Sequence, residues 1–134
     1  MQCALLHLVA KNGHYKVCVF ISENTKNPNP PNKDGWTPLH LAAESGHFKV
    51  YKYIFGNCDA KNPSANNNLT PLHLAARRGH FKICKFIIQS IEDKNPSNHC
   101  LTPLHLAAKF GHFEICLLIM KYIKDKNPAV NTTM

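Results

Sequence analysis

Nine histidines in 134 residues are the side chains most suited to chemistry, because imidazole binds metal ions and transfers protons near neutral pH. A structural zinc site gathers about four ligands in one cluster. Here eight histidines instead form four pairs spread evenly along the chain, and the two members of each pair are seven residues apart. The pairs are His7 with His14, His40 with His47, His73 with His80 and His105 with His112. This pattern favours a structural role that is repeated along the chain. A metal site would have to centre on the unpaired His99 and its neighbour Cys100, and we expect none there.

Other catalytic groups are sparse. The chain has no nucleophile elbow, no phosphate-binding loop and no HExxH motif. It has 8 acidic residues, and they are scattered. Asp34 and Glu44 are the two that fall near each other on one predicted edge, where turn and surface roles explain both. We therefore predict a protein that is not an enzyme and that takes no cofactor.

The paired histidines lie in a stretch that occurs several times. Its clearest copy is Leu69-Thr70-Pro71-Leu72-His73-Leu74-Ala75-Ala76, and near-copies stand at 36–43 and 101–108, with a weaker one at 4–10. The positions aligned with the threonine are 4, 37, 70 and 102, which are 33, 33 and 32 residues apart. Such a constant period predicts a stacked array of similar units.

Each unit is predicted to be a helix, a tight turn and a second helix. Thr70 can cap the first helix with its hydroxyl, and Pro71 suits the first helical position, where an N–H is not needed. Gly79 can adopt the left-handed conformation that ends this helix. The second helix shows an apolar stripe at helical spacing, made of His80, Ile83, Cys84, Ile87 and Ile88. Lysines lie on the other side of this helix.

The repeated string Thr-Pro-Leu-His-Leu-Ala-Ala, followed by Gly-His, closely resembles the ankyrin repeat over about residues 2–128. The resemblance implies an all-α solenoid of stacked antiparallel helix pairs with hairpin-like inter-repeat fingers. It also implies that the first histidine of each pair bonds within the finger and helix start, and that the second helps fix the turn between helices. We take 1–134 as a single domain, with repeats at about 1–31, 32–64, 65–96 and 97–128 and a tail at 129–134.

The repeats differ in their turns and ends. Asp34-Gly35 and Asn67-Asn68 suit tight turns at the finger tips, whereas His99-Cys100 suits one less well. Repeat one lacks the Thr-Pro start, although Val17, Cys18 and Ile21 keep the apolar phase of its second helix. The last second helix is unusually apolar at 115–120. We therefore expect the ends of the array to self-associate or to continue in a longer array.

Because no membrane span and no secretion signal stand out in the sequence, we expect an intracellular protein, in the cytoplasm first and the nucleus second, and the cysteines support this expectation. Cys18, Cys84 and Cys116 occupy one repeat position, and equivalent positions in neighbouring repeats lie about 8–10 Å apart, beyond disulfide reach. We therefore expect buried thiols without disulfide bonds. No segment has the length or apolar character of a membrane span, so membrane insertion is not expected.

The net charge of +8 points to an acidic partner or to nucleic acid. Many of the lysines recur on the predicted outer face of the second helices, where they keep a solenoid soluble: Lys16, Lys49, Lys52, Lys82 and Lys85. We expect these lysines to lack the interleaved aromatic residues of a nucleic-acid platform, so nucleic acid remains an alternative on charge alone.

By the resemblance, a partner protein binds the concave face, at the finger tips and the exposed ends of the first helices. Arg77, Arg78 and Lys109 make the middle of this face basic, so the expected partner carries an acidic segment. A structural spacer within a larger protein is the other alternative. Repeat one contributes only Lys11 and Asn12 to this face. The matching positions of repeats two to four are Lys33, Asp34, Trp36, Glu44, Ser45, Asn66, Asn67, Leu69, Arg77, Arg78, Asn98, His99, Leu101, Lys109 and Phe110.

Overall fold

The structure, a computed structural model, describes the backbone of residues 2–94, 96 and 101–126 and the side chains of residues 5–94, 96 and 101–123. Within this part of the chain the regular elements are eight helices, which confirms the predicted all-α class. They are α1 (Gln2–Asn12), α2 (Tyr15–Glu23), α3 (Pro38–Ser45), α4 (Phe48–Asn57), α5 (Pro71–Arg78), α6 (Phe81–Ser90), α7 (Pro103–Lys109) and α8 (Phe113–Lys126).

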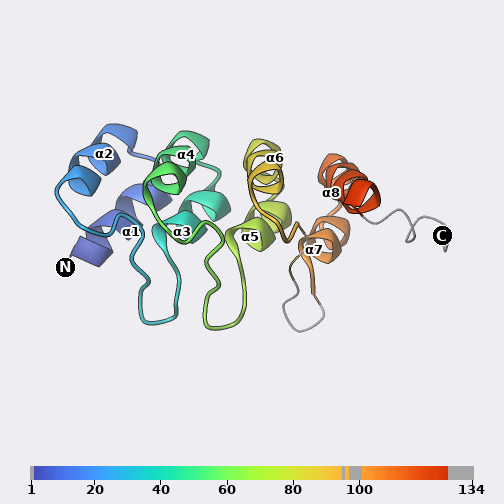
Figure 1. The fold of residues 1–134 in the computed structure, drawn as a ribbon, viewed down its shortest axis with the longest axis horizontal. Coiled ribbons are helices and arrows are strands. Elements are labelled where there is room, and N and C mark those ends of the chain that lie inside the picture. Colours follow the sequence, from blue (N-terminus) through green and yellow to red (C-terminus); the bar gives the residue numbers. More distant parts are fainter. Residues whose placement is uncertain (1, 95, 97–100, 127–134) are drawn as a thin grey trace.

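The helices form two layers along an extended array (Figure 1). The first helices of the pairs, α1, α3, α5 and α7, lie side by side in one row, and the second helices lie in the other. The helix pair α1–α2 and the helix pair α7–α8 lie at opposite ends of the array. Buried alanines let the first helices pack closely, because a small methyl side chain allows neighbouring backbones to approach each other. They include Ala42, Ala43, Ala75 and Ala76. The array is the predicted solenoid.

The first helices begin where the sequence predicts. Thr37, Thr70 and Thr102 are extended N-cap residues, and each hydroxyl accepts a hydrogen bond from the backbone N–H three residues on, at 3.2–3.3 Å. Proline follows in each case and fixes the first helical turn. At the other end of α5, Gly79 has a φ of +81°, a left-handed conformation that side chains disfavour. Local chemistry therefore sets these helix boundaries.

One continuous hydrophobic core runs between the two layers. In α6 the predicted stripe is confirmed, with Ile83, Cys84, Ile87 and Ile88 buried and Lys82 and Lys85 exposed. Tyr51 of α4 takes the place of the small cysteine, and its ring lies 6.2 Å from that of Phe86. The Tyr51 hydroxyl is buried without a hydrogen-bond partner, and burial raises its pKa well above the usual value. Repeat packing thus tolerates a large ring at this position.

The fingers are tight turns that project beyond the helices (Figure 1). In the first, the N–H of Asn32 donates to the carbonyl of Trp36 at 2.8 Å, and Gly35 has a φ of +81°. In the second, Ala65 bonds to Leu69 in the same way, and Asn68 has a φ of +65°. Both turns therefore have the conformation predicted from Asp34-Gly35 and Asn67-Asn68. The third pair of turn residues, His99-Cys100, lies outside the described residues.

Repeat one departs from the prediction at Val17. This side chain is 46% exposed, whereas its counterparts Val50 and Ile83 are buried. The expectation that it belongs to the buried stripe is wrong, because these counterparts pack toward a preceding helix pair and Val17 has none within the described residues. Cys18 is buried as predicted and Ile21 is half-buried.

The four cysteines whose side chains are described have free thiols, as predicted: Cys18, Cys58, Cys84 and Cys116. Burial raises the pKa of Cys84 to about 12, so this thiol stays protonated. Among the described helices, none combines the length and the apolar character that crossing a bilayer requires.

Candidate partner-binding surface

In repeats one to three, the first histidine of the pair holds the next finger to a helix. In repeat two, the Nε2–H of His40 donates to the carbonyl of Leu69 in the next finger at 2.8 Å. Its Nδ1 accepts from the N–H of Thr37 at 3.1 Å and lies 2.9 Å from the Thr37 hydroxyl. His7 reaches the Trp36 carbonyl in the same way, at 2.8 Å. The role implied by the resemblance is confirmed, and it extends from one repeat to the next.

Burial keeps the imidazoles of His40 and His73 neutral at pH 7. It lowers the pKa of His40 from 6.5 to about 4, with the charges of neighbouring histidines acting in the same direction. Burial also lowers the pKa of His73. A neutral ring suits the geometry, because the Nδ1 atom of His40 must accept a hydrogen bond while its Nε2 atom donates one. These histidines are therefore structural groups, and proton transfer is not needed to explain them.

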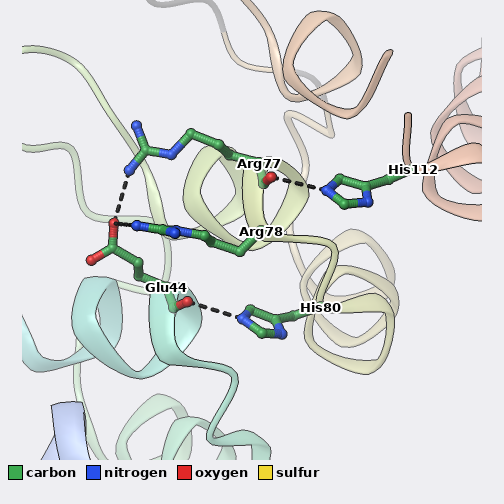
Figure 2. A network of polar contacts seen from close by, with 5 residues as sticks. All are labelled: Glu44, Arg77, Arg78, His80 and His112. Atoms are coloured by element: carbon green, nitrogen blue, oxygen red, sulfur yellow. Dashed lines mark hydrogen bonds and ion pairs between the residues drawn. The ribbon is translucent and has the colours of Figure 1, made fainter. Parts of the chain in front are cut away.

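In repeats two to four, the second histidine of the pair joins neighbouring repeats (Figure 2). The Nε2–H of His80 donates to the carbonyl of Glu44 at 2.9 Å, and that of His112 to the carbonyl of Arg77 at 3.0 Å. His47 does the same with Lys11, also at 3.0 Å. The resemblance implies that these histidines fix the turn between the two helices of a repeat. In the structure they bond to the last helical turn of the first helix in the preceding repeat, and these bonds orient the predicted partner-binding positions there.

Glu44 changes the expected charge of the surface. Its carboxylate lies 2.8 Å from the Arg77 guanidinium and 3.7 Å from that of Arg78, and both arginines reach across from α5 toward α3 (Figure 2). Glu44 therefore offsets part of the basic charge predicted for the middle of this face, because Arg77 is half-buried and paired with it. Arg78, at 58% side-chain exposure, and the exposed Lys109 keep charge available to a partner.

The finger tips supply a second group of predicted positions. Lys33, Asp34, Asn66 and Asn67 are all exposed. The N–H of Asn66 donates to the carbonyl of Asp34 at 3.0 Å, and its side-chain amide donates to the carbonyl of Lys33 at 3.1 Å. Adjacent fingers are thus hydrogen-bonded to each other, which fixes the backbone from which the side chains of Lys33 and Asp34 project.

The base of each finger is less uniform than predicted. Leu69 is only 9% exposed, so its side chain is part of the packing and the prediction that it meets a partner is wrong. Leu101, at the same position one repeat later, is 44% exposed. Trp36 is half-buried, with its ring centroid 5.6 Å from that of His40. Trp36 and Leu101 therefore remain candidates.

The remaining predicted positions lie at the ends of the first helices. Ser45 is half-buried in α3, while Lys109 and Phe110 at the end of α7 are exposed, with the Lys109 ammonium 5.5 Å from the Phe110 ring. In repeat one, Lys11 and Asn12 are exposed as well. Asn98 and His99 lie outside the described residues. We call the exposed tips and helix ends together the finger face: Lys33, Asp34, Trp36, Asn66, Asn67, Arg78, Leu101, Lys109 and Phe110.

Metal binding finds no support in the described residues, because no three histidine, cysteine, aspartate or glutamate side chains there are grouped to hold an ion. His99 and Cys100, where we placed the only candidate, are not among the residues covered by that statement.

One set of side chains was missed from the sequence. Phe81 and Phe113 are exposed at the first positions of α6 and α8, beside hollows of about 270 and 450 Å³. The signal was present, because an aromatic residue follows each Gly-His pair: Tyr15, Phe48, Phe81 and Phe113. Phe48 and Phe81 directly precede Lys49 and Lys82, so the expectation that these lysines lack aromatic neighbours is wrong.

Comparison with known families gives one match. The family model for ankyrin repeats matches residues 2–64 and 54–130, with three copies of the repeat. A search of curated proteins finds no match to the chain. The family match covers the same helix pairs that carry the capping threonines, the linking histidines and the finger face. The chain therefore belongs to the ankyrin-repeat family.

Proposed function

We propose that this protein binds a partner protein through the finger face. One observation carries the proposal: the string Thr-Pro-Leu-His-Leu-Ala-Ala, which caps and builds the first helices, is the same in repeats two to four, whereas the positions that directly follow it differ. Glu44, Arg77 and Lys109 are equivalent positions, for example, with three different side chains. Ankyrin repeats are in general protein-interaction modules, which supports the proposal.

An acidic segment is the proposed ligand of the middle of this face. Glu44 already neutralises part of the charge of the arginine pair, so a partner carboxylate has Arg78 and Lys109 left to meet. Arg78 is held near Glu44 at one side and presents the rest of its guanidinium to solvent. A guanidinium with free N–H groups can bind a carboxylate through two hydrogen bonds.

Affinity capture from the native cell extract tests the proposal. The bait is compared with a triple variant, Trp36→Ala with Arg78→Ala and Phe110→Ala, which removes the aromatic and arginine side chains that dominate interface energies. We expect the triple variant to lose the captured protein. A matched control, Lys16→Ala with Lys52→Ala and Lys85→Ala, removes exposed charges from the outer helices and should retain it. Equal capture by the triple variant and the parent protein refutes the finger face.

Charge reversal tests the acidic segment separately. Arg78→Glu should weaken binding of the captured protein about tenfold or more and flatten the dependence of its affinity on salt concentration. Circular dichroism before and after the change shows whether the helices are intact. Unchanged affinity and unchanged salt dependence would leave the finger face in place and exclude an acidic ligand at Arg78.

We also propose that the two ends of the array self-associate. Val17 and Phe20 at one end, and Leu101 and Leu117 in the last repeat, are exposed apolar side chains. Burying such side chains against a second copy removes apolar area from water. Light scattering over a range of protein concentrations tests this, and a strict monomer at the highest concentration contradicts it.

A further inference from the structure

Two hollows lie in line along the edge where the first helices turn into the second helices. One, of about 270 Å³, runs from Phe48 to Phe81, and the other, of about 450 Å³, runs from Phe81 to Phe113. Phe81 and Gly79 line both. We call this surface the aromatic groove. It contains none of the residues of the finger face.

The two rings that bound the second hollow are exposed. Phe81 is 40% and Phe113 is 69% exposed, whereas Phe48 packs on Phe86 with 5.8 Å between ring centroids. Aromatic side chains are the strongest anchors at protein interfaces, and exposed apolar surface around a hollow is typical of binding sites. The groove therefore offers two ring faces that the fold itself does not use.

The floor of the groove is held rigidly. A side chain at Gly79 would place its Cβ 2.6 Å from the ring of His112, so glycine is required for this close approach. The imidazoles of His80 and His112 are fixed in turn by their bonds to the carbonyls of Glu44 and Arg77 (Figure 2). A surface that is already ordered loses little entropy when it binds a ligand.

The spacing of the rings selects the conformation of a ligand. Neighbouring packed helices lie about 8–10 Å apart, and the groove offers one ring per repeat. A polyproline II helix returns to the same face every third residue, a rise of about 9.3 Å, which matches. A β-strand returns to one face at about 6.6 Å, which is too short, and an α-helix places further side chains between the two hollows.

Charge separates a peptide from a nucleic acid as the occupant. Lys49 and Lys82 follow Phe48 and Phe81, so acidic groups are favoured beside these rings. The most exposed ring, Phe113, is followed by the exposed Glu114, which also lines its hollow and repels acidic groups there. A nucleic acid carries a phosphate at every nucleotide, whereas a peptide can place its acidic residues beside Lys49 and Lys82 alone. Aromatic rings stack on proline and on other apolar side chains of proline-rich segments.

We propose that the aromatic groove binds a proline-rich segment of a partner protein in the polyproline II conformation. The segment carries an apolar residue at every third position, one for each hollow, and acidic residues between them over Lys49 and Lys82. This proposal stands independently of the finger face, because the two surfaces share no residue.

Fluorescence anisotropy tests it with a labelled peptide of repeated leucine, proline and glutamate triplets. We expect saturable binding. A control peptide of the same composition, with its leucines spaced alternately two and four residues apart, should bind at least about tenfold more weakly. Phe81→Ala and Phe113→Ala should each weaken binding about tenfold. Lys82→Glu should weaken it less and reduce its salt dependence.

Phe110→Ala is the matched control. Phe110 is 50% exposed and one position before Gly111, but it belongs to the finger face and lines neither hollow. The Phe110→Ala variant should bind the triplet peptide with the same affinity as the parent protein. Because Phe113 is exposed, Phe113→Ala keeps the fold, which circular dichroism verifies, so a lost signal reports the groove.

Three results overturn the proposal. They are equal binding of the two peptides, parent-like affinity of Phe113→Ala, and tighter binding of a single-stranded oligonucleotide than of the triplet peptide. The capture experiment on the finger face is read separately, because Phe81→Ala and Phe113→Ala leave every residue of that face in place.

Discussion

Repeats three and four contain the same eight residues in a row, at 69–76 and 101–108, yet these residues have different surroundings. Leu69 and Ala76 are buried, whereas Leu101 and Ala108 are exposed. The ring of His73 is fully buried, and that of His105 is exposed. The difference is the neighbour: α7 covers α5, and within the described residues no further helix pair covers α7. Burial in this protein is thus a property of position in the array.

The two copies agree in everything local. Thr70 and Thr102 cap their helices through the same atoms, and proline follows each. The Nδ1 atom of His73 accepts from the N–H of Thr70 at 3.1 Å, and His105 does the same with Thr102 at 3.2 Å. The comparison therefore separates what a segment does by itself from what a neighbouring repeat adds.

Ala76→Asp and Ala108→Asp should differ most. The first places a carboxylate in the fully buried contact between helices and should lower the free energy of unfolding by roughly 3–5 kcal/mol, because the buried charge has no partner. The second meets solvent and should change it by less than about 0.5 kcal/mol. Urea unfolding followed by circular dichroism measures both. Equal losses would show that α7 is covered as α5 is.

Acid should destabilise the array through its buried histidines. Because the pKa of His40 is lowered from 6.5 to about 4, the unfolded chain binds protons more readily, and stability present above pH 6.5 is lost as the pH falls toward 4. The His40 contribution is about 3 kcal/mol, and the lowered pKa of His73 acts in the same direction.

Unfolding at several pH values tests this on two matched variants. His40→Gln cannot take up the proton, so its free energy of unfolding should fall less steeply between pH 6.5 and 4 than that of the parent protein. His105→Gln, at an exposed ring, should keep the parental slope. If the two variants change the slope equally, the burial of His40 is not its cause.

Helix capping should be insensitive to the neighbour. Thr70→Ala and Thr102→Ala each remove one hydroxyl that accepts the backbone N–H of the third helical residue, His73 or His105, at 3.3 and 3.2 Å. Each should cost about 1 kcal/mol of unfolding free energy, and the two costs should agree. A Thr70→Ala cost several times larger, measured by thermal unfolding, would mean that the cap also depends on packing between repeats.

The pair of Arg77 with Glu44 should have the smallest effect. The Arg77 and Glu44 side chains are 31% and 24% exposed, so solvent screens their attraction, and a double-mutant cycle should give a coupling below about 1 kcal/mol at low salt. The coupling should shrink further at high salt. Lys109→Ala, at the equivalent exposed position of repeat four, provides the reference. A coupling that exceeds the cost of a lost cap would make this pair a structural element.

The fold was predictable because the signals are local and repeated. Threonine, proline and glycine mark the ends of the first helices within a few residues, and the apolar stripe of α6 follows from its own spacing. The tight turns at Gly35 and Asn68 were predicted for the same reason. The candidate surface was predictable only as a set of equivalent positions, because aligning the copies of the repeat shows which positions differ between them.

The availability of each side chain was decided by the tertiary structure. Leu69 is buried by the packing around it, Arg77 is paired with a residue 33 positions earlier, and Phe81 and Phe113 bound hollows made by two repeats. Hydrogen bonds within a turn depend on residues three or four apart, which a sequence displays directly. Contacts between repeats depend on the stacking of whole helix pairs, so the same leucine, histidine and alanine of one octapeptide are buried in repeat three and exposed in repeat four.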